Sequence, residues 1–508
     1  MRRFLVALSA VALAGCAACS SSDPTPSDPN SADSSPSAVA TSSEGAGQRP
    51  YSDNPTLEEC HGLAHGGDSA GDSAEPVPAA EDGGGTTTLP EDAAQHGPAA
   101  AGQESPGAAE PATGSVTPSA DSDAASDAGG SSIAEECLRA IPAQELAGAL
   151  LATGITTYEQ AEEAVDLGVR HLFIGTGTDF SILNGQGDPA RSLAALQERA
   201  GGTLEISVDE EGGVVQRLSD LIGPLPSAEE MANTMTPQQV KDMMREHGKK
   251  LRDLGLTMDF APVADLAGAE TVEENAIGSR AFSDDPQKVA EYARAYAEGL
   301  LEAGIEPVFK HFPGHGHTTG DSHLGTVTAP ERAELEANDM VPFAQVAGMP
   351  GASMMVGHMQ TPGLDGAMSE NGDRATGEGA AAEGGTGGTP VLGANTPASL
   401  NPGVYDLLRR GGYSVGAGGV GREGGGAAGA PAFAGTIFTD DLTGMKAVTD
   451  LHPGPDAAVA ALEAGADQAL TAAGAIAVPD LVAAVRQAIE SGRISKEHVY
   501  AAVTRAHL

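Results

Sequence analysis

Eight short apolar runs, separated by amphipathic stretches, constrain the fold of this chain more than any other feature. They lie at 148–153, 170–176, 204–209, 256–262, 305–311, 353–359, 435–441 and 466–472. Helical spacing fills the intervals, most clearly at 237–255 and at 285–304, and both of these segments stop close to a glycine. Strands that alternate with helices form parallel sheets, and eight such units predict an α/β fold with one (β/α)8 TIM-type barrel. An open doubly wound sheet is the alternative, but no GxGxxG motif follows an early strand.

The N-terminus has the pattern of an export signal. Residues 1–16 hold two arginines, an apolar run and small residues before Cys16. The sequence LAGC at 13–16 resembles a bacterial lipobox, which implies a lipoprotein signal peptide and a lipid on Cys16. An ordinary cleaved signal with a chance cysteine is the alternative. We therefore expect an exported protein, anchored by lipid to the outer face of the cytoplasmic membrane, because no other apolar run is long enough to cross a bilayer.

Composition divides the rest of the chain. Residues 17–137 are rich in Ser, Ala, Gly, Pro and Asp and poor in branched or aromatic side chains, so we expect a disordered linker there. The catalytic barrel is expected at 138–508. Two low-complexity segments within it, at 372–390 and 416–435, are expected to be surface insertions.

Charge and cysteines limit the partners. The formal net charge is −44, with 71 acidic and 27 basic residues, which argues against nucleic acid as a partner because phosphate binding needs a positive face. An exported chain can form disulfides, so Cys60 and Cys137 could be bonded, or they could be free thiols. With Cys16 lipidated, the remaining Cys19, Cys60 and Cys137 offer no CxxC-type metal site.

Ionisable residues stand where several apolar runs stop, in the segments SVDEEGG, KHFPGHG, VGHM and FTDDL. Barrel active sites are built at the carboxyl ends of strands. Of the adjacent Asp440 and Asp441, only one should face the pocket if the strand continues, and Asp440 is the candidate nucleophile for glycosyl transfer. A helix N-cap or a loop turn is the alternative role for such a pair.

The segment at 310–327 holds four of the 13 histidines, His311, His315, His317 and His323. In an extended loop Asp321 and His323 project to the same side, so the carboxylate could hold one ring nitrogen while the other faces a substrate. A metal site is the alternative, although it would need ligands at fixed separations with supporting partners. A phosphate-binding loop would need GxxxxGK[ST], which is absent. We expect an acid–base loop, with no metal and no cofactor.

Several segments together resemble one known family. KHFPGHG followed by DSH, then VDEEGG with VQR, DFAPVAD, IGSRAF and FTDDL, are similar to the bacterial β-N-acetylglucosaminidases of glycoside hydrolase family 3. The resemblance implies that Asp440 is the nucleophile and that His323 is the general acid/base with Asp321 as its partner. It implies substrate-binding roles for Asp209, Arg217, Arg280, Lys310 and His311. For Arg217, an ion pair with a neighbouring acid is an equal alternative.

The resemblance is incomplete at three places. Val214 stands where the family commonly has arginine, His317 stands where an Asp or Asn is usual, and the stretch at 366–391 is longer than expected. None of these removes a proposed catalytic group.

The function that the resemblance implies is an exo-acting, retaining β-N-acetylglucosaminidase that removes non-reducing β-linked GlcNAc from peptidoglycan fragments. Its partners would be such saccharides and, through the lipid, a membrane. Two alternatives remain open: a β-N-acetylglucosaminide phosphorylase or broader β-glycosidase, and a non-catalytic glycan-binding envelope lipoprotein.

Overall fold

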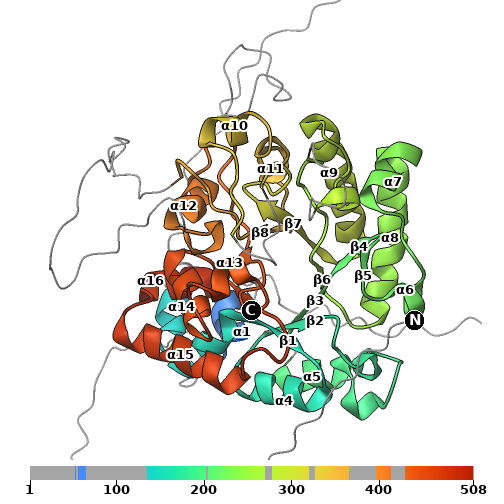
Figure 1. Cartoon of the computed structure of the whole chain (residues 1–508). Helices are drawn as coiled ribbons and strands as arrows, with labels where there is room; N and C mark the ends of the chain where they lie inside the picture. The colour runs from blue at the N-terminus through green and yellow to red at the C-terminus, as the bar shows by residue number, and fades with distance from the viewer. Residues whose placement is uncertain are drawn as a thin grey trace, which may run out of the picture. The chain divides into compact units, whose positions relative to one another are not determined.

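Eight parallel strands lie side by side in a ring (Figure 1). The computed structural model describes residues 52, 55–64, 134–201, 204–268, 277–319, 326–364, 396–413 and 429–506. The strand order is β10-β1-β2-β3-β6-β7-β8-β9. The strands are β1 (Leu151–Ile155), β2 (His171–Ile174), β3 (Glu205–Val208), β6 (Met258–Asp259), β7 (Glu306–Phe312), β8 (Ser353–Val356), β9 (Ile437–Thr439) and β10 (Ala469–Thr471). A separate antiparallel hairpin pairs β4 (Glu210–Gly212) with β5 (Val215–Gln216).

The two ends of the strand order meet, which closes the ring. A parallel bridge joins Phe438 to Gln468, and the Thr439 amide donates to the Gln468 carbonyl at 3.1 Å. On the other side of β10, Leu151 pairs with Ala469. The predicted (β/α)8 barrel is therefore confirmed, and the open doubly wound sheet is wrong.

Alternation along the strands separates two hydrophobic layers. Side chains that point inward form one cluster inside the ring, and they come from seven of the eight strands and from the residue that follows β6. The cluster consists of Ala152, Phe173, Met258, Phe260, Val308, Met355, Phe438 and Leu470. Neighbouring residues such as Leu172, Ile206 and Met354 point outward and pack against the helices. Every second side chain of a strand thus points into the ring, both in the core and near the open end of the ring.

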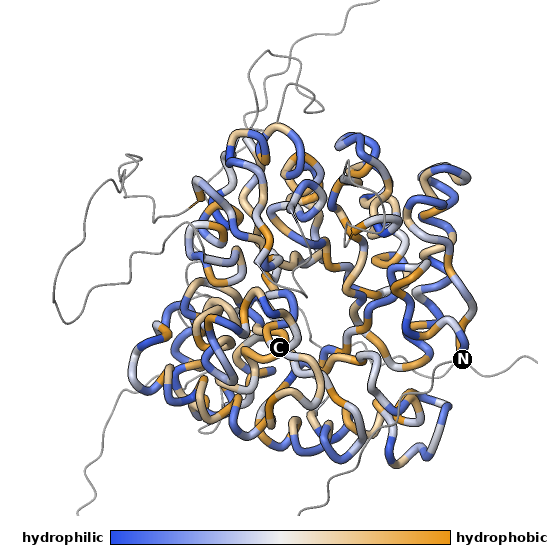
Figure 2. Tube along the Cα trace, viewed as in Figure 1, coloured by the Kyte–Doolittle hydropathy of each residue, from blue (hydrophilic) through white to orange (hydrophobic). Residues whose placement is uncertain are grey.

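Helices cover the outside of the ring (Figure 1). They are α3 (Ala143–Ala149), α4 (Tyr158–Asp166), α5 (Leu193–Ala200), α6 (Ser219–Ile222), α7 (Ala228–Thr234), α8 (Pro237–Asp253), α9 (Pro286–Glu302), α10 (Arg332–Ala337), α11 (Val341–Val346), α12 (Pro402–Arg410), α13 (Lys446–Thr449), α14 (Asp456–Ala464), α15 (Val478–Ser491) and α16 (Lys496–Arg505). Short 3-10 turns are η1 (Phe180–Ile182), η2 (Pro189–Arg191), η3 (Gly278–Arg280) and η4 (Ala398–Leu400). Figure 2 shows hydrophobic and hydrophilic stretches alternating along these helices, as expected for amphipathic helices that cover a sheet.

Local signals explain where the two longest helices begin. Thr236 and Gln239 form a capping box at the start of α8, and Pro237 occupies the first turn. Asp285 caps α9 in a similar way, followed by Pro286. These helices match the segments predicted at 237–255 and 285–304.

The first predicted strand begins too early. Residues 148–150 belong to α3 and its C-terminal cap, and β1 starts at Leu151. Within this helix, a Cβ at Gly148 would lie 2.3 Å from the Gly168 carbonyl carbon, so α3 and the loop after α4 can approach this closely only without a side chain.

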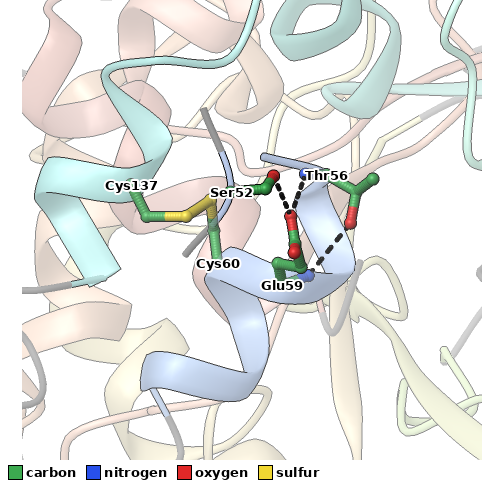
Figure 3. Close-up of a disulfide and its surroundings, with 5 residues drawn as sticks. All are labelled: Ser52, Thr56, Glu59, Cys60 and Cys137. Atoms are coloured by element: carbon green, nitrogen blue, oxygen red, sulfur yellow. Dashed lines mark hydrogen bonds between the residues drawn. A yellow bond between two sulfur atoms is a disulfide. The ribbon is translucent and has the colours of Figure 1, made fainter. Parts of the chain in front are cut away.

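A short helix, α1 (Leu57–Ala64), lies within the segment predicted to be a disordered linker. It carries Cys60, which forms a disulfide with Cys137 (Figure 3). The Thr56 hydroxyl accepts from the Glu59 amide at 3.1 Å, while the Glu59 carboxylate accepts from the Thr56 amide at 3.0 Å. This capping box starts the helix, and buried Leu57 and Cys60 fix it to the main hydrophobic core. The linker prediction therefore does not describe residues 55–64, nor residues 134–137, which are helical and include the buried Cys137.

Several predicted features lie outside the described residues. They are the signal peptide with Cys16, most of the linker, the segment at 372–390 and residues 416–428 of the other low-complexity segment. Within the described ranges, no helix has both the length and the apolar character needed to span a membrane.

Candidate active site

A cavity of about 460 Å³ opens at the carboxyl ends of the strands. Residues that directly follow strands line it, and they are Thr156, Gly175, Asp209, Asp440 and Ala472. Lys310 and His311, near the end of β7, and Arg217 and Arg280 line it as well. The five predicted substrate-binding residues and the predicted nucleophile are thus brought together.

Asp440 and Asp441 both line the cavity, because β9 ends at Thr439 and the strand alternation does not continue through the pair. The condition under which only one of them was expected to face the pocket, a strand that continues through the pair, is therefore not met. Their hydrogen bonds nevertheless differ. The Asp441 carboxylate accepts from the amides of Thr443, Gly444 and Ala472, each at 2.9 Å, so it holds the turn after β9 against the end of β10.

The Asp440 carboxylate is less engaged. Its Oδ1 accepts from the Asp441 amide at 2.8 Å, while Oδ2 has no hydrogen-bond partner within the described ranges. Burial opposes ionisation, but the neighbouring His358 and His311 rings, the Asp441 amide and Lys310 outweigh it and hold the pKa of Asp440 well below its usual range. Asp440 is thus an ionised carboxylate with one oxygen available to the cavity.

Lys310 is buried, with 3% of its side chain exposed, and two carboxylates surround it. Its Nζ lies 2.9 Å from Asp209 Oδ1 and 2.6 Å from Glu211 Oε1. Burial lowers the pKa of such a lysine, but Asp209 and Glu211 more than reverse this effect, so the pKa is raised and the ammonium persists.

Glu211 joins Lys310 to Arg280. The Arg280 guanidinium donates to both oxygens of Glu211, at 2.8 and 2.9 Å. Burial opposes ionisation, yet Arg280 and Lys310 lower the pKa of Glu211 to about 2. This bidentate ion pair holds the Glu211 carboxylate in place, and Glu211 in turn holds the Lys310 ammonium.

Arg217 approaches Asp209 from the hairpin side. Its NH2 donates to Asp209 Oδ2 at 3.2 Å, so Lys310 and Arg217 hold one oxygen of Asp209 each. The ion-pair alternative for Arg217 is therefore present in the structure, and Arg217 lines the cavity at the same time.

Asp265 organises the start of the histidine-rich loop. It is fully buried, accepts from His311 Nδ1 at 2.6 Å, and also accepts from the His315 amide at 2.7 Å. Because Nδ1 of His311 is hydrogen-bonded to the Asp265 carboxylate, Nε2 is the ring nitrogen left to contact a substrate. Burial lowers the pKa of His315, which also lines the cavity, to about 4.

His317 has a different partner. Its Nδ1 lies 2.9 Å from Asp339 Oδ1, and this hydrogen bond raises the pKa of His317. The rings of His311 and His317 therefore contact separate carboxylates, and within the described ranges no group of three His, Cys, Asp or Glu residues is placed to hold a metal ion.

Asp321 and His323 lie outside the described residues. The chain on either side of them is placed: Thr319 and Thr328 form an antiparallel bridge, with the Thr319 amide donating to the Thr328 carbonyl at 3.0 Å. Their predicted roles stay predictions.

Sequence reasoning assigned no role to three residues that shape this site. Glu211 and Asp265 were recognisable only as acids near strand ends, and His358 only as a histidine after an apolar run. Their partners are 41 to 99 residues away in sequence, so only the closed barrel shows what they contact.

A parallel eight-stranded barrel with carboxylates and cations around a cavity at its carboxyl end is the arrangement of a (β/α)8-barrel enzyme, and paired acids at such a site suit glycoside hydrolysis. Residues 156–507 match the model of the glycosyl hydrolase family 3 N terminal domain. The chain belongs to this family and is a glycoside hydrolase, which acts on O-glycosyl bonds, as the resemblance implied.

Individual relatives agree with this assignment. The chain is 38% identical over 360 residues to the beta-hexosaminidase LpqI of Mycobacterium tuberculosis, covering 70% of this chain and 79% of that protein. A crystal structure of a GH3 family glycosyl hydrolase from Mycobacterium smegmatis is 40% identical with a TM-score of 0.60, covering 73% of this chain and 97% of that one. The solved structure of M. tuberculosis LpqI is 36% identical with a TM-score of 0.59, covering 73% and 94%.

Proposed function

We propose that this protein is an exo-acting, retaining β-N-acetylglucosaminidase that removes non-reducing β-linked GlcNAc from peptidoglycan fragments. The observation that carries the proposal is Asp440, an ionised carboxylate at the end of β9 with one oxygen held and one open to the cavity. The beta-hexosaminidase name of the M. tuberculosis relative supports an N-acetylhexosamine as the sugar.

In the first step Asp440 Oδ2 attacks the anomeric carbon and the bond to the leaving oxygen breaks. His323, held by Asp321, gives its proton to that oxygen. In the second step His323 takes a proton from water, the water oxygen attacks the same carbon, and the Asp440 ester is released as a carboxylate. Two inversions give net retention, and the protein returns to its starting charge.

The cluster around Lys310 binds the sugar. Lys310 and His311 donate hydrogen bonds to hydroxyl oxygens, and Asp209 accepts from hydroxyl groups with the lone pairs that Lys310 and Arg217 leave free. Arg280 acts through Glu211, which keeps the ammonium of Lys310 in place. All six residues lie around the cavity that Asp440 lines.

We also propose export and a lipid on Cys16. The disulfide attaches Cys60 to Cys137, and Cys60 lies 44 residues after Cys16 in the sequence. At about 3.4 Å per residue, a fully extended segment of this length reaches roughly 150 Å, so the enzyme would act within the cell envelope.

Matched substitutions of the adjacent aspartates test the nucleophile. Asp440→Asn should lower kcat on an aryl β-N-acetylglucosaminide by more than about 10⁴-fold, since the attacking oxygen is lost. Asp441→Asn should retain far more activity, because that carboxylate holds the turn rather than the sugar. Equal activity of Asp440→Asn and the wild type would refute the proposal.

The acid/base group and the acceptor are tested separately. His323→Ala should spare aryl substrates with good leaving groups and cripple poor ones, because only the latter need protonation. Inorganic phosphate should leave the product as free GlcNAc, whereas accumulation of a sugar 1-phosphate would favour a phosphorylase.

A further inference from the structure

His358 lies just after β8, and its ring is hydrogen-bonded to two other segments, one of which is the turn that carries Asp440 and Asp441. Its Nε2 lies 2.9 Å from the Asp441 carbonyl oxygen, and its Nδ1 lies 2.7 Å from the Ser399 hydroxyl in η4. The ring is 1% exposed. A carbonyl oxygen only accepts hydrogen bonds, so Nε2 carries a hydrogen in either protonation state of the ring. The other ring nitrogen, Nδ1, is hydrogen-bonded to the Ser399 hydroxyl.

Asp441 is therefore held from two sides. His358 binds its backbone carbonyl, while Thr443, Gly444 and Ala472 bind its carboxylate. With both ends of the residue fixed, its amide hydrogen points to Asp440 Oδ1 at 2.8 Å. The Asp440 rotamer thus depends on a chain of contacts that begins at His358.

We propose that His358 is a positioning residue for the nucleophile, acting through the Asp441 backbone; the proposal rests on the role of Asp440 proposed above. By keeping Oδ1 occupied, the arrangement leaves Oδ2 directed to the cavity. The same amide stabilises Oδ1 when it becomes the carbonyl oxygen of the ester and again when the carboxylate is released.

Other charged groups face Asp440 and remain when His358 is replaced. Lys310 and His311 come from β7, His315 comes from the following loop, and Asp441 is adjacent. They keep Asp440 ionised near neutral pH in a His358 variant. The expected change is therefore in the geometry of attack and in the acidic limb of the pH profile, rather than in the affinity for the sugar.

Two substitutions separate positioning from packing. His358→Gln can still donate an amide N–H to the Asp441 carbonyl, whereas His358→Leu fills similar space without a donor. A misplacement of about 1 Å can cost about 100-fold in rate, so His358→Leu should lower kcat by about 10- to 100-fold with little change in KM. His358→Gln should recover most of that loss.

A second readout is the acidic limb of kcat/KM against pH. It should move to higher pH in both His358→Leu and His358→Gln, because each replacement removes the imidazole whose charge lowers the pKa of Asp440 in the free enzyme. Ser399→Ala removes only the Nδ1 partner and should lower kcat less than His358→Leu. It serves as the milder variant if His358→Leu does not fold.

The outcomes are distinct. Equal losses of kcat in His358→Leu and His358→Gln would overturn the proposal, because the hydrogen bond to the Asp441 carbonyl would then make no difference. Wild-type kcat in His358→Leu, with Asp440→Asn inactive, would overturn the positioning role and leave the proposed function intact. A wild-type enzyme without activity on the aryl β-N-acetylglucosaminide would overturn both.

Discussion

Glu211→Gln tests how the buried charge cluster is held together. Glu211 is 5% exposed and lies between two cations, with Lys310 Nζ at 2.6 Å and the Arg280 guanidinium at 2.8 and 2.9 Å. Gln removes the negative charge but keeps the size of the side chain. Lys310 and Arg280 then share the cluster with Asp209 as its remaining acid.

The cost can be worked from the pKa. The cations lower the pKa of Glu211 from 4.5 to about 2, and at about 1.4 kcal/mol per pH unit this is on the order of 3 kcal/mol of folding free energy. Removing one partner of a buried pair costs about 3–5 kcal/mol, which agrees. A lowered carboxyl pKa contributes stability above pH 4.5 and loses it as the pH falls toward 2.

Urea unfolding of the two proteins gives the measurement. At pH 7 we expect Glu211→Gln to lose about 3 kcal/mol of unfolding free energy, and we expect the gap to narrow as the pH falls below 4.5. Glu246→Gln is the control, because Glu246 pairs with Lys249 at 2.8 Å on the surface, with side chains 60% and 55% exposed. That change should cost much less stability than Glu211→Gln, because exposed ion pairs contribute little. Similar small losses in both variants would refute the reasoning.

Two further predictions concern stability. Replacing Cys60 and Cys137 together with Ser should lower Tm and make it insensitive to reductant, since the disulfide spans 77 residues and could contribute up to about 4–5 kcal/mol by chain entropy; an unchanged Tm would contradict this. Glu306, beside Glu205 at the opposite end of the barrel, has its pKa raised to about 7 by burial and by that neighbour. Its contribution to stability is present below pH 4.5 and is lost as the pH rises through about 7, so Glu306→Gln should be more stable than the wild type at pH 8 but not at pH 4.5 by urea unfolding. A parallel pH dependence of the two proteins would exclude Glu306 as the source.

The barrel could be predicted because its signals are local. Each strand is a short apolar run, and the segments between the strands carry helical periodicity with caps such as Asp285. The packing of Gly148 against Gly168 could not be predicted, because it depends on how α3 and the loop after α4 approach each other. Helix α1 could have been found from the Thr56–Glu59 capping box, but the surrounding low-complexity composition hid it.

The site divides in the same way. Asp440 and Asp209 follow strands and Lys310 lies near the end of one, so all three could be placed at one edge of the barrel from the sequence. The roles of Glu211 and Asp265 required the fold, since each acts through a residue on another strand or loop. The hydrogen bonds of the turn after β9 were needed to identify Asp440 Oδ2 as the carboxylate oxygen that is open to the cavity.

The most direct test of Asp440 as nucleophile is covalent trapping. A fluorinated N-acetylglucosaminyl fluoride should form a slowly released ester, and trypsin should then yield the peptide of residues 423–446, which contains both Asp440 and Asp441. Fragmentation in the mass spectrometer should place the added sugar on Asp440. A sugar on Asp441, or an unlabelled peptide from an enzyme that the reagent has inactivated, would contradict the account.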